Sequence, residues 1–256
     1  MQHLTLGYLT LNATPAETIT AAAAAGFKSV GIRITGRRVF DPYTAVIGNR
    51  PMLGELKQRL ADGGLRLSNV TAYHLFPDLK MDDMRAVIDT TAELGAGILL
   101  AHSYVPVDDK LVDFFSEYCA YAAQAGIRIA VEYMRYSEVK SLEEATAWLD
   151  RAAQPNAGFV FDPLHVDRAG GSFTALRAVD PARIVFVQIC DAKKQSGTPT
   201  TEELLIEART GRLPPGAGNL PLYEFLDALP PEVEIEYEVP ILGAGAMSAT
   251  EKARLA

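Results

Sequence analysis

The segment Phe159–His165 reads FVFDPLH, which places a carboxylate directly after a short, fully apolar run. Three bulky apolar residues between a glycine and a proline predict a strand that is buried on both faces, as in a parallel sheet. Asp162 at the exit of such a strand is costly unless a cation or hydrogen-bond donors meet it. The segment therefore predicts either a metal or catalytic site, with His165 three residues further on, or an N-cap for a following helix.

The rest of the chain alternates strand-like and helical segments on both sides of this one. Predicted strands lie at residues 4–11, 28–34, 65–71, 96–101, 127–133, 159–161, 183–190 and 233–239. Capping boxes such as Thr14-x-x-Glu17 and Ser141-x-x-Glu144 open helices, and glycines close them. The alternation predicts parallel βαβ units. Eight such units in 256 residues, without a composition break, predict a single (β/α)₈ TIM barrel over residues 1–256.

The longest connection lies between the last two predicted strands, at residues 192–219, with a helix expected over 201–210 and another over 220–229. The first strand-to-helix turn lacks G-x-G-x-x-G, which argues against a dinucleotide-binding fold, and no P-loop is present. A short helix is expected after Arg168-Ala169-Gly170-Gly171.

Composition excludes several classes of function. The chain is 48% hydrophobic, has a net charge of −8 and contains two cysteines. The negative charge opposes binding to nucleic acid or anionic membranes, and two cysteines support no disulfide framework. No signal peptide or membrane-spanning run is evident. We therefore expect a cytoplasmic protein with a small-molecule substrate, while homo-oligomerisation stays open.

Polar residues gather at the predicted C-terminal strand ends, where (β/α)₈ barrels build their active sites. The set comprises Arg33, His74, His102, Glu132, Asp162, Gln188 with Asp191, and Glu236 or Glu238. Each has an alternative interpretation: the histidines as hydrogen-bonded structural residues, Gln188 as an amide in the barrel wall and Asp191 as a cap. A charge in the apolar run around Glu132, however, requires a partner.

The last predicted strand reads VEIEYEV and carries Glu234, Glu236 and Glu238 on one face by alternation. They cannot all be buried without partners, so the glutamate nearest the strand's exit is expected to meet a cation.

Four of these residues point to a metal site. Glu132, Asp162, Gln188 and Glu238 come from four successive predicted strands, and neighbouring strands lie about 4.8 Å apart, so their side chains can converge. Carboxylate and amide oxygens suit Mg²⁺ or Mn²⁺ better than zinc.

These residues resemble the xylose isomerase-like TIM-barrel superfamily, which includes many sugar phosphate isomerases and epimerases. The matching segments are VEYM, FDPLH, VQICDA, ARTGRLPPGAG and EYEVP, and the resemblance covers nearly the whole chain. The family holds a metal with Glu, Asp, His and Glu from strands five to eight. Its D-x-x-H motif corresponds here to Asp162 and His165.

Two departures from the family pattern stand out. Gln188 replaces the usual histidine of strand seven, and Ala217 stands where an acidic residue is usual. A Glu/Asp/Gln/Glu set is similar to that of 3-dehydroshikimate dehydratases in this superfamily. The EVP ending favours Glu238 as the fourth ligand, whereas the phrase IEYE also resembles patterns in which Glu236 is the ligand.

The resemblance implies a metal-dependent isomerase or epimerase that acts on a small hydroxy-ketone through an enediolate. Glu132 and Glu238 would remove and return the proton, and His165 would hydrogen-bond a substrate oxygen. The expected substrate contacts are Arg33, His74, His102 and Arg168, in which the arginines would orient a carboxylate or phosphate.

Three other functions compete with this one. A dehydratase would use the same metal and base, with a β-hydroxyl leaving in place of proton return. A DNA-repair endonuclease of the superfamily would need a His-rich multi-metal cluster, and this chain has four histidines and an unfavourable charge. A non-catalytic binding protein would explain Gln188 as the sign of a lost metal site.

Overall fold

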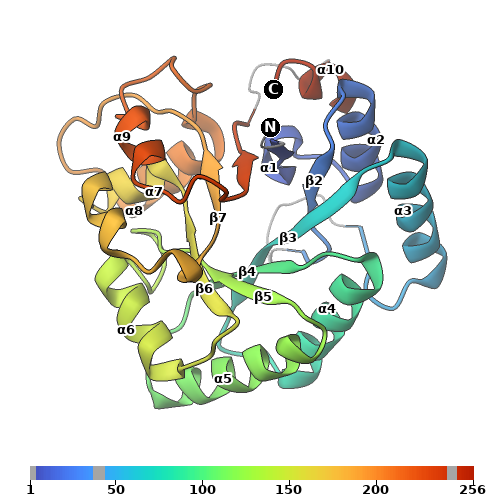
Figure 1. Cartoon of the computed structure of the whole chain (residues 1–256), viewed down its shortest axis with the longest axis horizontal. Helices are drawn as coiled ribbons and strands as arrows, with labels where there is room; N and C mark the ends of the chain where they lie inside the picture. The colour runs from blue at the N-terminus through green and yellow to red at the C-terminus, as the bar shows by residue number, and fades with distance from the viewer. Residues whose placement is uncertain (1–3, 37–43, 241–246) are drawn as a thin grey trace.

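Eight parallel strands close into a barrel in the computed structural model, which describes residues 4–36, 44–240 and 247–256 (Figure 1). Each strand pairs with its neighbours in chain order, and β1 pairs with β8 to close the ring. The predicted (β/α)₈ barrel is confirmed. The strands are β1 (Thr5–Leu6), β2 (Ser29–Ile32), β3 (Arg66–Leu75), β4 (Ile98–Ser103), β5 (Arg128–Val131), β6 (Ala157–Phe161), β7 (Ile184–Ile189) and β8 (Ile235–Tyr237).

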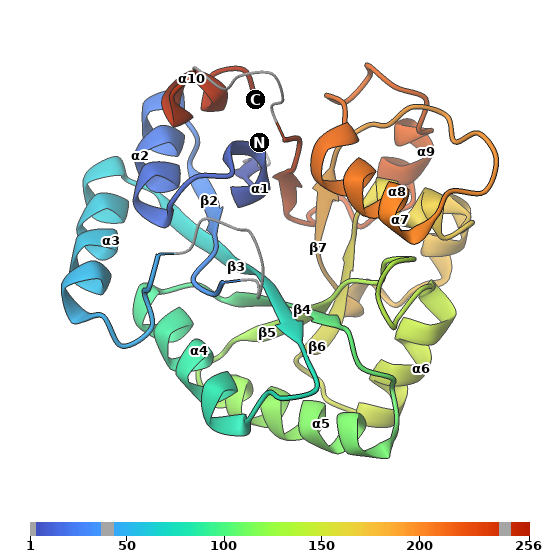
Figure 2. The same cartoon turned by 180° about the vertical axis from the view of Figure 1, so that it is seen from behind.

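Helices form a ring outside the strands, which both views show (Figures 1 and 2). Near the C-terminal end of the chain, α10 packs on α2 and also contacts α1. The helices are α1 (Tyr8–Leu11), α2 (Pro15–Ala25), α3 (Arg50–Gly63), α4 (Met81–Leu94), α5 (Asp109–Gln124), α6 (Leu142–Ala152), α7 (Pro163–Arg168), α8 (Thr201–Ile206), α9 (Leu222–Asp227) and α10 (Ala249–Ala253), with short turns η1 (Phe173–Ala178), η2 (Pro181–Arg183) and the π-helical η3 (Glu207–Gly211). No helix in these described ranges is both long and apolar enough to cross a bilayer.

Successive side chains along each strand point alternately outward, toward the helices, and inward, toward the barrel interior. Most of the core lies between strands and helices, and it includes Phe159 and Phe161, whose stacked rings have centroids 5.4 Å apart. Val160 points the opposite way, as period-two alternation requires. It belongs to a small separate cluster that we assign to the barrel interior: Ile98, Leu100, Ala130, Val160, Val185 and Phe186.

The first predicted strand, residues 4–11, is wrong in its second half. The strand ends at Leu6, and Tyr8–Leu11 is helical. Gly7 donates its N–H to the carbonyl of Tyr237 at 2.9 Å, and a Cβ on Gly7 would lie 2.8 Å from that oxygen. The chain can therefore turn only because this position lacks a side chain. The turn brings Tyr8 to the mouth of the barrel.

Glu234 connects strands of the barrel by hydrogen bonds near the point where β1 pairs with β8. Its Oε1 accepts hydrogen bonds from Thr5 Oγ1 and Arg66 Nη2, each at 2.7 Å. Burial alone would raise the pKa of Glu234, but hydrogen bonds from Arg66, Ser68 and Thr5 outweigh it and leave the pKa below its ordinary value. The ionised carboxylate therefore stabilises the folded state.

We expect Glu234→Gln to lower the free energy of unfolding by about 1 kcal/mol near pH 7. The folded-state pKa of Glu234 lies below the ordinary value of 4.5, so the stabilisation is complete above that value and is lost as the pH falls through the folded pKa. The difference between variant and wild type should therefore shrink near pH 3. Urea unfolding of both proteins at the two pH values checks this. A difference that is the same at both would contradict an electrostatic role.

Candidate active site

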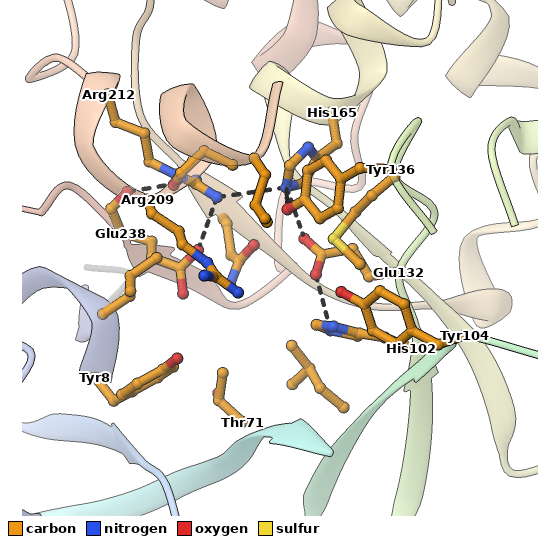
Figure 3. A pocket seen from close by; sticks show the side chains of 16 residues that line it. Tyr8, Thr71, His102, Tyr104, Glu132, Tyr136, His165, Arg209, Arg212 and Glu238 are labelled. Carbon is orange, nitrogen blue, oxygen red and sulfur yellow. Dashed lines mark hydrogen bonds and ion pairs between the residues drawn. The ribbon is translucent and has the colours of Figure 1, made fainter. Parts of the chain in front are cut away.

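A pocket at the C-terminal ends of the strands brings together five of the residues that the sequence singled out (Figure 3). Its lining includes the predicted residues His102, Glu132, His165, Gln188 and Glu238. Aromatic rings at its edge come from three separate connections: Tyr8, Tyr104 and Tyr136. The pocket thus has polar groups at its centre and a partly apolar rim, as small-molecule sites usually do.

Glu132 follows β5 directly and is buried. Its Oε2 lies 2.9 Å from Nε2 of His102, while Oε1 lies 3.8 Å from Nε2 of His165. Oε1 accepts no hydrogen bond from any residue that the structure describes. Burial alone would raise the pKa of Glu132, but attraction and a hydrogen bond from His102 lower it below the ordinary value. The carboxylate is therefore ionised and has one oxygen available to a ligand.

The N-cap alternative for Asp162 is confirmed, and its carboxylate also meets a cation. It is the N-cap of α7, where its Oδ1 accepts a hydrogen bond from Leu164 N–H at 2.8 Å. Its Oδ2 forms an ion pair with Nη1 of Arg212. Burial by itself would raise the pKa of Asp162, but Arg212 outweighs it and keeps the carboxyl ionised.

His165 lies one turn into α7 with its Nε2 in the pocket. Nε2 is 3.5 Å from the hydroxyl of Tyr136, which can donate or accept, and 3.5 Å from Nη2 of Arg212, which can only donate. Burial lowers the pKa of His165, which favours a neutral ring with a lone pair on Nε2. Ligand atoms of Glu132, Asp162 and His165 all lie within 4.8 Å of one another, so these three residues could hold a metal ion.

Gln188 lines the pocket and also contacts Glu236, a buried residue that is not part of the pocket lining. Gln188 Nε2 donates to Glu236 at 3.1 Å, and Asn69 Nδ2 donates to the same carboxylate at 2.6 Å. Burial raises the pKa of Glu236 to about 7. Glu238, in contrast, lines the pocket itself. Glu238 is therefore better placed than Glu236 to face a substrate or metal.

Arg212 is the central residue that the sequence analysis missed. Its guanidinium pairs with Asp162 and, through Nη2, with Oε2 of Glu238 at 3.2 Å. Glu238 thus meets a cation, as expected of the last glutamate in its strand. Burial raises the pKa of Glu238 and outweighs the attraction of Arg212. Arg212 follows η3, and Arg209 within the same π-helical turn also lines the pocket.

The donor set fits a divalent cation. Glu132 Oε1 and Gln188 Oε1 are buried oxygens that accept no hydrogen bond from the described residues. When ionised, the carboxylates of Glu132, Asp162 and Glu238 carry three negative charges, against one positive charge on Arg212. A divalent ion would neutralise the remainder, and oxygen donors with one imidazole are typical of Mn²⁺ or Mg²⁺.

The family model described as "Xylose isomerase-like TIM barrel" matches residues 19–241. The chain belongs to this family. Two curated relatives are named 3-dehydroshikimate dehydratase, one from Pseudomonas putida and one from Pseudomonas aeruginosa, with 25% and 26% identity over 231 residues. In each, the alignment covers 85% of this chain and 34% of the relative. The chain thus matches about a third of their length.

A solved structure of the family's fold, described as the IOLI protein with a bound zinc atom, superimposes with a TM-score of 0.80 at 18% identity. The match covers 98% of this chain and 94% of that one. At this identity the likeness shows the fold alone. It agrees with the barrel geometry described above.

In this family member, two predicted substrate contacts, Arg33 and Arg168, lie outside the pocket lining. Arg168 is held by both carboxylate oxygens of Glu207, at 2.6 and 2.7 Å, and so ties α7 to η3. Because the Glu207 carboxylate already balances its charge, the geometry gives no support for Arg168 as a substrate contact. Arg33 stacks its guanidinium 5.6 Å from the ring centre of Tyr8. His74 lies in β3, in register with His102, but its side chain is outside the described part.

Proposed function

We propose that this chain is a metal-dependent enzyme that removes a proton from a carbon next to a ketone in a small hydroxylated substrate. The observation that carries this proposal is the unequal environment of the Glu132 carboxylate. Oε2 is held by His102, while Oε1 faces the pocket without a hydrogen bond from the described residues. A buried, ionised carboxylate that is fixed on one side and available on the other is suited to be a general base.

The metal proposed here is Mn²⁺ or Mg²⁺. Glu132, Asp162 and His165 form the close group of ligand atoms, and Gln188 and Glu238 would complete the coordination. When bound, the ion would supply Lewis-acid stabilisation of negative charge on the substrate oxygens. His165 can donate or accept a hydrogen bond at a substrate oxygen, and Tyr136 lies 3.5 Å from its Nε2. The aromatic rim would limit access of water to the reacting carbon.

Among reactions that begin with this proton removal, we place dehydration first. Both curated relatives reported above are named 3-dehydroshikimate dehydratase, and Gln188 completes a Glu/Asp/Gln/Glu set similar to that of such enzymes. Glu132 would take the proton from carbon, the bond to the β-hydroxyl would break, and the hydroxyl would leave with a proton as water. One water is lost and no further reactant is consumed.

Isomerisation or epimerisation is the second candidate, and a different observation favours it. Glu132 and Glu238 lie on opposite sides of the pocket (Figure 3). One glutamate could remove the proton and the other could return it to the second face of the intermediate. Dehydration is preferred because both curated relatives are named 3-dehydroshikimate dehydratase.

Proton removal can be tested without knowing which reaction follows. Metal-loaded protein is incubated in D₂O with 3-dehydroshikimate, hydroxypyruvate and a set of ketoses, and NMR follows the hydrogens next to the ketone. We expect deuterium exchange with at least one substrate, with loss of one water for a dehydratase or deuterium in the product for an epimerase. Chelator-treated protein is the control. Absence of exchange with every substrate, at full metal loading, would count against the proposal.

A further inference from the structure

The guanidinium of Arg212 lies between Glu238 and His165 (Figure 3) and also contacts Asp162, so three proposed metal-site groups meet at it. Nη1 pairs with Oδ2 of Asp162, and Nη2 lies 3.2 Å from Oε2 of Glu238 and 3.5 Å from Nε2 of His165. Both oxygens of Asp162 are thereby used, because Oδ1 already accepts the Leu164 N–H. One cationic side chain therefore engages one oxygen of Asp162 and one of Glu238 and approaches the His165 imidazole, which are three of the atoms available to a metal.

The position of Arg212 is held by the chain itself. Its Nε donates to the carbonyl of Ala208 at 2.7 Å, and the side chain is buried. Despite burial, which disfavours a charged guanidinium, the neighbouring carboxylates raise the pKa of Arg212. Without this cation, Asp162 and Glu238 would face each other as buried carboxylates with a large desolvation penalty.

Little room is left beside the guanidinium. The cavity between the lining residues has a volume of about 40 Å³, which is enough for roughly three water molecules. A divalent ion needs the same carboxylate oxygens that Arg212 engages, and two cations on the same oxygens repel each other strongly at low dielectric. Metal and guanidinium therefore compete for these ligand atoms.

We propose that Arg212 is the resident counter-cation of this site, which fills the carboxylate cluster when no metal is bound and must draw back for a divalent ion to bind. The inference rests on the proposed metal site and assigns a role to a residue outside its ligand set. Arg212 is thus a positioning residue that preserves the ligands in the metal-free protein and lowers their affinity for metal. The affinity of the site for metal therefore depends on competition between the divalent ion and the Arg212 guanidinium.

The test is titration of the purified, metal-free protein with MnCl₂ by calorimetry, in wild type and in Arg212→Gln. We expect the variant to bind Mn²⁺ with a Kd at least tenfold lower, and to have a lower Tm than wild type in the absence of metal. Arg168→Gln is the matched control, because Arg168 is also buried and bound by a carboxylate, that of Glu207, outside the pocket. This control should lower the Tm but leave the Kd within about twofold.

The outcomes separate this inference from the proposed function. Tighter binding in Arg212→Gln, or binding in the variant alone, supports it. An unchanged or higher Kd in the variant overturns it and leaves the metal site in place. Absence of binding in both proteins overturns the inference and the proposed metal dependence together.

Crystal structures of the wild type provide a second measurement that does not depend on a folded variant. With Mn²⁺ bound, the guanidinium of Arg212 should have left the oxygens of Asp162 and Glu238. A guanidinium that still contacts both beside a bound ion would overturn the competition and show that Arg212 orients the ligands.

Discussion

Replacing Glu132 with glutamine is expected to reduce turnover by roughly a thousandfold or more, since a positioned general base contributes about 10²–10⁴-fold. The amide has nearly the shape of the carboxylate but cannot accept a proton from carbon. Its carbonyl oxygen can still accept a hydrogen bond from His102, which lies 2.9 Å from Oε2 in the wild type. The barrel should therefore stay folded while the reaction stops.

The measurement for Glu132→Gln is deuterium exchange and product formation on the best substrate, with metal content and circular dichroism recorded in parallel. Glu234→Gln is the matched control, because it makes the same chemical change where β1 closes against β8, away from the pocket lining. It should lower stability but keep turnover. Near-normal turnover of Glu132→Gln on the true substrate would remove Glu132 as the base in both proposed reactions.

The barrel could be predicted from sequence because its signals are local. Buried strand runs, capping residues and helix-ending glycines each act within a few residues. Thr14 and Glu17 form the reciprocal capping box that was predicted. At the second predicted box, Ser141 Oγ accepts a hydrogen bond from the N–H of Glu144, but the Glu144 carboxylate accepts one from the N–H of Lys140 and not from that of Ser141. The first strand was predicted too long because its end depends on a contact between Gly7 and a carbonyl more than two hundred residues away.

The candidate site residues that could be predicted from the sequence are those that lie at the ends of predicted strands. Glu132 and Asp162 were found because each directly follows a buried strand. Alternation alone could not choose between Glu236 and Glu238, because both lie on the same face and only their height in the barrel separates them. The signal for Arg212 was weak, since its place in the pocket depends on a π-helical turn where the sequence suggests an ordinary helix.

Asp191, by contrast, was predicted at a strand end but turns out to hold a loop. Its carboxylate accepts hydrogen bonds from four backbone N–H groups, those of Ala192, Gly216, Gly218 and Leu220, at 2.8–3.0 Å. Its own backbone also exchanges two 2.7 Å hydrogen bonds with Leu213. A Cβ at Gly218 would collide with the carboxylate, so the loop fits closely around it. Asp191 thus anchors the segment that follows Arg212.

Asp191→Ala is therefore expected to lower the free energy of unfolding by about 4 kcal/mol, because charge-assisted hydrogen bonds contribute about 1.5–3 kcal/mol each and are not additive within one group. The variant leaves buried N–H groups without an acceptor and frees the segment beside Arg212. Urea unfolding measures the loss, with Asp109→Ala as the control, because the Asp109 side chain is 99% exposed and should cost less than about 1 kcal/mol. If Asp191→Ala lowered the free energy of unfolding no more than this control, Asp191 would not be the residue that holds the loop.

Metal titration of Asp191→Ala shows in addition whether the loop fixes Arg212. A guanidinium that is no longer held in place should compete less with the metal, so Mn²⁺ should bind more tightly to the variant than to the wild type.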